Sequence, residues 1–300
     1  MRKMKQRTLE SSRKRETAKV ATLFLIPVFL LLIVFIFYPV IDTFITSFFK
    51  WNGISADKTF IGWRNWKTLV TDTAFWKAFL NNIVLVVFAI VLQLPISLAL
   101  ATFLNFTGKK SNLFKVAWFI PMLMSSVAVG FLFSYILATN GGVISTISQA
   151  LGGGNIDLLG NPRLALIAVM AVISWQSIPF YMVFFLASFS GISGEIFDAA
   201  RIDGATRGDY FWKVALPLLK PSISKATVLA LVGSLKYFDL VYAMTNGGPG
   251  NATELMATYM YKNSFVEFNM GYGSAVAAGM FILISLFSLI TMKLTAGKEE

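Results

Sequence analysis

Residues Val20–Ile41 read VATLFLIPVFLLLIVFIFYPVI, an apolar run without a charged side chain. A helix of about 20 apolar residues spans the hydrocarbon core of a bilayer, so this run predicts a transmembrane helix. Eight Lys or Arg precede it in Met1–Lys19. A secretory signal peptide also places a basic segment before an apolar one, but this run is too long and no small-residue cleavage pattern follows it. We therefore interpret it as a retained first helix.

Five further apolar blocks of similar length follow along the chain. They are Phe79–Leu104, Phe114–Leu137, Leu164–Phe189, Ser222–Met244 and Gly271–Leu294. Of the 300 residues, 56% are hydrophobic and only 14% are charged, which excludes an ordinary soluble domain. A membrane barrel would show short segments of alternating polarity instead. The sequence thus predicts an all-α membrane protein with six transmembrane helices.

The basic residues indicate how the helices are oriented. Alternate connecting segments must face opposite sides of the membrane, and the set that contains the N-terminus and residues 191–221 is the richer in Lys and Arg. The positive-inside rule places that set, and with it both termini, in the cytoplasm. We expect a cytoplasmic N-terminus at 1–19, one transmembrane domain at 20–294 and a cytoplasmic tail at 295–300. The net charge of +11 is then a topology signal and not a nucleic-acid site.

Missing residue types narrow the chemistry. The chain has no Cys and no His, which excludes thiol nucleophiles, His-based acid–base catalysis and the usual zinc sites. Its nearest approach to a phosphate-binding loop is Gly108-Lys109-Lys110-Ser111, where Phe103 occupies the position of the required upstream Gly. We expect no catalytic residue, no metal and no ATP site in this chain.

The most informative segment is residues 193–221, SGEIFDAARIDGATRGDYFWKVALPLLKP. It predicts two short helices joined by a turn. Ser193 is a suitable N-cap, and Glu195 lies in the first turn, where a negative charge suits the helix dipole. Asp203-Gly204 predicts the turn, because Gly adopts the left-handed conformation that ends helices. Pro217 marks a break before the fifth transmembrane helix.

This segment resembles the EAA loop of binding-protein-dependent ABC importer permeases. Asp198-Ala199-Ala200, then Gly204, then Val214-Ala215-Leu216-Pro217 stand at the family spacing, with Asp198 replacing the usual Glu and Val214 the usual Ile. The resemblance implies a coupling helix that docks into a cleft on a separate ATPase; an ordinary interfacial helix–turn–helix is the alternative. The coupling residues that it implies are Glu195, Asp198, Ala199, Ala200, Asp203, Gly204, Arg207 and Pro217.

Other motifs resemble the carbohydrate-type permeases of this family. They include Tyr38-Pro39, Asn81-Asn82 and the Gly-rich segment Thr245–Thr253, TNGGPGNAT. The resemblance implies the type I ABC importer permease fold in the cytoplasmic membrane of a prokaryote. It also implies a second homologous permease subunit, an ABC ATPase dimer that binds ATP and Mg, and an extracytoplasmic sugar-binding protein. The expected cargo is a di- or oligosaccharide.

Polar residues inside the predicted helices are candidates for a substrate pathway. Charged groups in a bilayer face a partner or a water-filled path. Lys236 and Asp239 are three residues apart, so they could pair on one helix face or line the pathway. Amides and aromatic rings suit the hydroxyls and apolar faces of a sugar, although they also pack in ordinary helix interfaces. The pathway candidates are Gln93, Trp175, Gln176, Tyr181, Lys236, Tyr237 and Asp239.

Three other functions are alternatives to a sugar importer. An ion-coupled secondary transporter would show an inverted repeat and intramembrane carboxylates, of which only Asp239 is evident. An intramembrane enzyme would need a nucleophile and base, and no convincing pair is present. An importer of the same class could instead carry another solute, such as glycerol phosphate.

Overall fold

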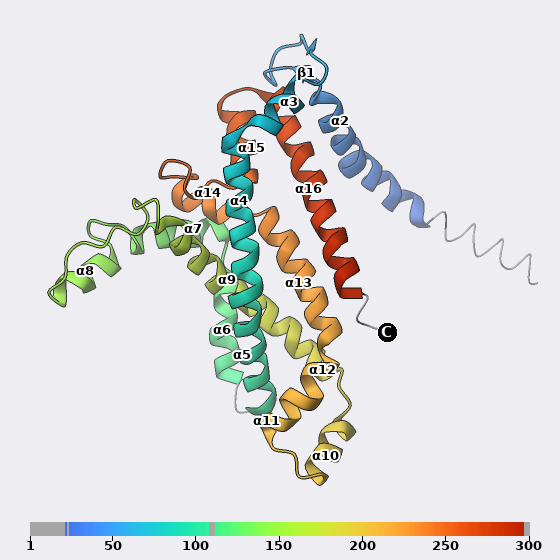
Figure 1. The fold of residues 1–300 in the computed structure, drawn as a ribbon, viewed down its shortest axis with the longest axis vertical. Coiled ribbons are helices and arrows are strands. Elements are labelled where there is room, and N and C mark those ends of the chain that lie inside the picture. The colour runs from blue at the N-terminus through green and yellow to red at the C-terminus, as the bar shows by residue number, and fades with distance from the viewer. Residues whose placement is uncertain (1–21, 23, 108–111, 297–300) are drawn as a thin grey trace, which may run out of the picture.

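The computed structural model describes residue 22, residues 24–107 and residues 112–296. In this part of the chain the architecture is helical, with one two-stranded hairpin (Figure 1). Four helices are long and apolar enough to cross a membrane, and the number rises to six if two bent helix pairs each count as one span. Some of the sequence predictions concern segments outside the described residues: 1–19, 108–111 and 297–300.

The first span covers Phe24–Thr46 and leans away from the other helices (Figure 1). It contains the π-helical turn η1 (Ile33–Phe37) and α2 (Tyr38–Thr46). Its main contact is with the last helix, where the rings of Phe44 and Phe281 lie 5.9 Å apart. The antiparallel strands β1 (Phe49–Lys50) and β2 (Thr59–Phe60) follow at the same end of the molecule.

The second span is a single 35-residue stretch, Thr73–Thr107, and begins earlier than the predicted Phe79. After the short α3 (Arg64–Thr71), it consists of α4 (Thr73–Phe88), η2 (Ala89–Gln93) and α5 (Leu94–Thr107). Asp72 explains the early start, because its carboxylate accepts hydrogen bonds from the Ala74 and Phe75 amides and caps α4.

The Asp72 carboxylate also accepts hydrogen bonds from the hydroxyls of Tyr259 and Tyr272. Burial acts to raise the pKa of Asp72. The two hydroxyls and the two backbone amides outweigh burial, so the pKa lies below its ordinary value. This side chain therefore ties the start of the second span to the two helical segments near the end of the chain.

The third span differs from the single helix predicted over Phe114–Leu137. It consists of α6 (Asn112–Leu123) and α7 (Ser126–Ile136), which meet at 99°. The short α8 (Val143–Ala150) follows and projects to one side (Figure 1). The fourth span, α9 (Ala165–Ser190), matches the prediction within a residue at each end and continues through Pro179.

The fifth span bends beside Pro217, where a break was predicted, but it departs from the single helix predicted over Ser222–Met244. Its first part, Arg207–Leu218, meets α13 (Lys220–Leu235) at 66°. This first part consists of α11 (Arg207–Asp209), η4 (Tyr210–Ala215) and α12 (Leu216–Leu218). The chain then leaves helical geometry at Lys236–Phe238 and resumes as α14 (Asp239–Thr245). We call Lys236–Phe238 the break in span five.

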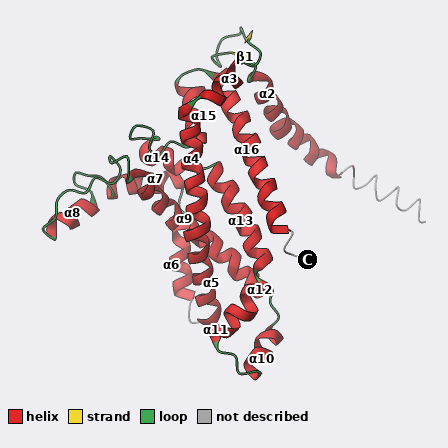
Figure 2. Cartoon of the chain, in the orientation of Figure 1, coloured by secondary structure: helices red, strands yellow, loops and turns green. Residues whose placement is uncertain are grey.

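The last helices complete the described part of the chain, in which Figure 2 shows helices joined by loops. The segments α15 (Met256–Tyr261) and η5 (Lys262–Val266) precede the sixth span, α16 (Met270–Ala296). The apolar core between α4, α13, α15 and α16 includes Phe75, Leu235 and Val276, each almost fully buried. The α10 helix lies at one end of the bundle and β1 at the opposite end (Figure 1), and we name the two ends accordingly.

Candidate functional site: the α10 loop and the break in span five

The helix α10 (Gly194–Ile202) is closed at both ends. The Ser193 hydroxyl oxygen accepts a hydrogen bond from the Glu195 amide (3.3 Å), which confirms the predicted N-cap. At the other end Gly204 adopts the predicted left-handed conformation, with φ of 77°. The Ala205 amide then donates to the Ala200 carbonyl (2.9 Å), a bond typical of a glycine-terminated helix. The sequence therefore sets both ends of α10 without help from another subunit.

The helix that follows is capped by its own side chains. The Thr206 hydroxyl accepts from the Asp209 amide (3.1 Å), and the Asp209 carboxylate accepts from the Thr206 amide (3.3 Å). Such a capping box satisfies two backbone donors at once. Asp209 also pairs with Lys213, but both side chains are exposed, so this ion pair adds little to stability.

Tyr210 anchors the loop to the bundle. It is buried, and its ring meets the Phe197 ring of α10 edge-on at 4.9 Å and the Phe106 ring of α5 at 6.1 Å. Aromatic pairs at such distances hold a preferred geometry. Tyr210 thus packs α10 and the start of span five against the end of span two, and the Arg207 guanidinium over the Phe106 ring (5.8 Å) adds a second contact.

The predicted coupling residues gather on the outer surface of this loop. Ala200 is half-buried, and the others are exposed: Glu195, Asp198, Ala199, Asp203, Gly204, Arg207 and Pro217. Between them Ile202 exposes 86% of its surface. A small-residue helix with a fully exposed Ile, held at both ends, is a surface suited to a protein partner.

The break in span five brings Lys236, Tyr237 and Asp239 together but does not pair the two charges. Lys236 ends α13 and Asp239 begins α14, so the helical spacing assumed for a pair does not exist. Among the described residues the ion pairs are Asp209–Lys213 and Glu254–Lys262. Lys236 and Asp239 are both exposed, while Tyr237 packs with Trp175 against one apolar cluster. The break therefore exposes two unpaired charges beside aromatic rings.

The remaining pathway candidates are buried between helices of the chain. The Gln176 amide donates to the Met124 carbonyl (3.0 Å) at the bend in span three. The Gln93 side chain accepts from the Ser174 hydroxyl (3.3 Å). Tyr181 is 7% exposed and packs in the apolar core near the α10 end. These three residues have structural contacts here, and their part in a substrate pathway stays a prediction.

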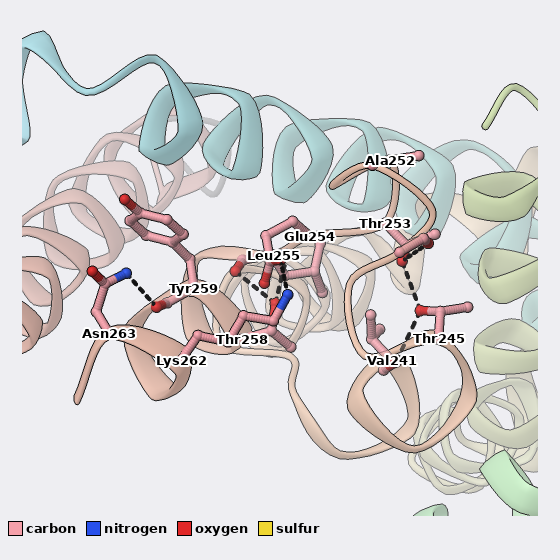
Figure 3. A network of polar contacts seen from close by, with 12 residues as sticks. Val241, Thr245, Ala252, Thr253, Glu254, Leu255, Thr258, Tyr259, Lys262 and Asn263 are labelled. Atoms are coloured by element: carbon pink, nitrogen blue, oxygen red, sulfur yellow. Dashed lines mark hydrogen bonds and ion pairs between the residues drawn. The ribbon is translucent and has the colours of Figure 1, made fainter. Parts of the chain in front are cut away.

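A polar network lies toward the β1 end, around the segment that joins α14 to α15 (Figure 3). Glu254 is 1% exposed and pairs with Lys262 of η5, while its Oε1 has no hydrogen-bond partner among the described residues. A Cβ placed on Gly247 would lie 2.4 Å from Oε2 of Glu254. Gly247 also has a φ of 80°, so this turn needs glycine for two reasons. The Gly-rich motif thus forms a closed turn over a buried carboxylate.

Residues 93–296 match the family described as binding-protein-dependent transport system inner membrane component. The chain belongs to this family. As a permease it resembles YurN of Bacillus subtilis, a probable ABC transporter permease, with 34% identity over 93% of this chain and 97% of that protein. It is also 34% identical to MsmF of Streptococcus mutans, a multiple sugar-binding transport system permease, over 91% of this chain and 93% of the relative.

A solved structure shows the same fold. The permease matches a chain of a bacterial ABC transporter that imports the acidic polysaccharide alginate, with a TM-score of 0.82. The match covers 97% of this chain and 99% of the other at 21% sequence identity. The predicted all-helical permease fold is thereby confirmed.

Family membership decides between the functions considered from the sequence. The permease is a multi-pass inner-membrane component of a binding-protein-dependent ABC system, and not a catalytic subunit. Nucleotide is bound by a partner subunit of such a system. The ion-coupled transporter is therefore set aside.

Several residues that organise the permease were missed or only noted in passing. Glu254 is a buried acid that sequence reasoning overlooked, and its partner Lys262 is eight residues away. Asn82 was noted only as part of a motif, yet it is fully buried. The signal that could have found them is the same in each case: a polar residue inside or beside an apolar helix, which in a membrane protein needs a partner.

Proposed function

We propose that this permease imports an oligosaccharide. The support comes from relatives that are named for such cargo: MsmF for multiple sugars, MalF of Thermococcus litoralis for trehalose and maltose, and AraP of Bacillus subtilis for arabinooligosaccharides. A second matching structure is an alginate transporter in complex with a periplasmic protein bound to an alginate pentasaccharide. No relative named here carries glycerol phosphate, so a sugar chain is the better-supported cargo.

The α10 loop is the proposed docking surface for the ATPase. The observation that carries this proposal is a short, exposed helix that is capped at both ends and packed through Tyr210 onto the bundle. Such a helix can transmit a movement of the ATPase to the bundle, because both of its ends are capped and it is packed against the bundle. The set of connecting segments to which the loop belongs is richer in Lys and Arg than the other set, which supports a cytoplasmic position beside the motor.

In the proposed assembly this permease pairs with a second, homologous permease. An ATPase dimer sits below them, with ATP and Mg, and an extracytoplasmic sugar-binding protein docks at the β1 end. The cargo passes between the two permeases. The exposed charges at the break in span five, with Tyr237 and Trp175 beside them, support a place for the break along this path. Sugar rings stack on aromatic side chains, and charged groups bind their hydroxyls.

The docking proposal can be tested by cross-linking, because the chain has no Cys of its own. Ile202→Cys places one thiol on α10, and Ile54→Cys, 74% exposed, places one at the β1 end as a control. With a maleimide–amine cross-linker in native membranes, we expect Ile202→Cys to give a covalent product that contains an ABC ATPase. Ile54→Cys should give none.

A membrane-impermeant maleimide applied to spheroplasts tests the orientation with the same variants. Ile54→Cys should react at once, and Ile202→Cys only after the membrane is opened. Reaction of Ile202→Cys in sealed spheroplasts, or equal cross-linking of both variants to the ATPase, would contradict the proposal.

A further inference from the structure

One fully buried amide joins the end of α13, where the break in span five begins, to the start of α15. Asn82 lies on α4 and is 0% exposed. Its side-chain nitrogen donates to the carbonyls of Ser234 (2.7 Å) and Leu235 (3.3 Å), in the last turn of α13. Its side-chain oxygen accepts from the backbone amide of Met256 (2.9 Å), the first residue of α15. Three backbone groups from two other helices thus meet one side chain of span two.

These backbone groups lose their regular helical partners, and the Ser234 carbonyl keeps only a long bond from the Tyr237 amide (3.5 Å). In a continuous helix the carbonyls of Ser234 and Leu235 would accept from the amides four residues on. The chain leaves helical geometry at Lys236–Phe238, where Phe238 has φ of −142° and ψ of −64°, so that arrangement is lost. The Met256 amide, at a helix start, has no partner within its own helix either. Where water is excluded, unsatisfied backbone groups are strongly unfavourable.

We propose that Asn82 is a positioning residue that fixes the end of α13 at the break in span five and so sets where Lys236 lies. The amide supplies the donor that the end of α13 lacks and the acceptor that the start of α15 lacks. An aliphatic side chain of the same size would offer neither. The statement that the break faces substrate rests on the proposed function. The positioning role of Asn82 does not depend on it.

The neighbouring Asn81 is a matched control that the chain itself provides. It is the same residue type on the same helix, but its amide donates to the carbonyls of Ala252 (3.1 Å) and Glu254 (2.9 Å). It therefore fixes the loop before α15 and makes no bond to the break. Replacing either residue removes two hydrogen bonds to backbone carbonyls, which are part-buried at Asn81 and buried at Asn82. Only Asn82 acts on α13, and it also loses the bond from the Met256 amide.

The test uses a single thiol at the break. Lys236→Cys is introduced alone, and then together with Asn82→Leu or with Asn81→Leu, and each form is expressed with its partner subunits in native membranes. The rate of labelling by a water-soluble maleimide is measured in each. We expect Asn82→Leu to change this rate several-fold, because α13 must find other donors for its last carbonyls. Asn81→Leu should leave the rate as in the Lys236→Cys parent.

The outcomes separate positioning from general damage. An unchanged rate with Asn82→Leu would overturn the inference, and so would equal changes with both variants, which would indicate loosening of the bundle. Asn82→Asp, which fills the same space with fewer donors, serves if the Leu variant does not assemble, and a several-fold change in the labelling rate is again expected. A changed labelling rate with undiminished sugar uptake would refute the proposed pathway and leave the positioning role intact.

Discussion

Removing Lys262 should leave a buried carboxylate without its partner. The Glu254 side chain is 2% exposed, whereas that of Lys262 is 24% exposed. Loss of one member of a buried ion pair destabilises a protein by about 3–5 kcal/mol. Because Lys262 is partly solvated, we expect Lys262→Met to cost about 3 kcal/mol, at the lower end of that range.

The expected loss is measurable as a thermal shift. The shift in Tm per kcal/mol falls with chain length and is below about 2 °C for a chain of 300 residues, so the purified Lys262→Met complex should unfold about 5 °C below the parent. Intrinsic Trp fluorescence during heating of the detergent-extracted complex reports the transition. Glu254→Gln should shift Tm less, because the exposed end of Lys262 can reach water.

The double variant decides whether the charge is responsible. In Glu254→Gln/Lys262→Met no buried charge remains, so much of the Tm lost in Lys262→Met should return. If the double variant is as unstable as Lys262→Met alone, the loss comes from packing and the reasoning from charge fails. A Lys262→Met complex as stable as the parent would show that the carboxylate is neutralised in some other way.

Two further predictions concern the ends of span two and α10. Gly204→Val should leave membrane insertion intact and abolish uptake of a labelled oligosaccharide, because φ of 77° is strained for a β-branched residue. Gly204→Asn should keep most uptake. Normal uptake by the Val variant would contradict the coupling role. Since the pKa of Asp72 is lowered, its ionised form stabilises the folded state at every pH above the ordinary Asp pKa of about 3.9. This stabilisation is lost as the pH falls through the lower pKa of the folded state. Asp72→Asn should therefore lower Tm at neutral pH and flatten the acid limb of Tm against pH; parallel curves would contradict this.

Local sequence explains those parts of the fold that local chemistry controls. The apolar runs predicted the spans, since length and hydropathy alone decide which segments cross a bilayer. Ser193 and Gly204 predicted the ends of α10, because capping acts within a few residues of the chain. The span boundaries erred where a side chain outside the apolar run, such as Asp72, starts the helix earlier.

Pro217 predicted the 66° bend at the start of span five, but two other interruptions inside the spans could not be predicted in the same way. Neither the bend in span three nor the break in span five has a Gly or Pro at its centre. Each is instead matched by an amide from another span, Gln176 at the Met124 carbonyl and Asn82 at the end of α13. The stabilising partner is 52 residues away in the first case and more than 150 in the second. Such pairings appear only once the helices are assembled.

The isolated first span bears on the order in which the molecule is built. The side chains of its hydrophobic stretch are not buried against the rest of the chain. Its principal neighbour is α16, where the Phe44 and Phe281 rings are in contact. The two partners of this contact stand near opposite ends of the chain, so during synthesis the first helix enters the lipid long before its neighbour exists. Its entry must therefore depend on hydropathy alone, and the joining of first and last helices is a late, non-local step of assembly. Mutations at that seam should slow maturation of the permease more than they hinder its insertion.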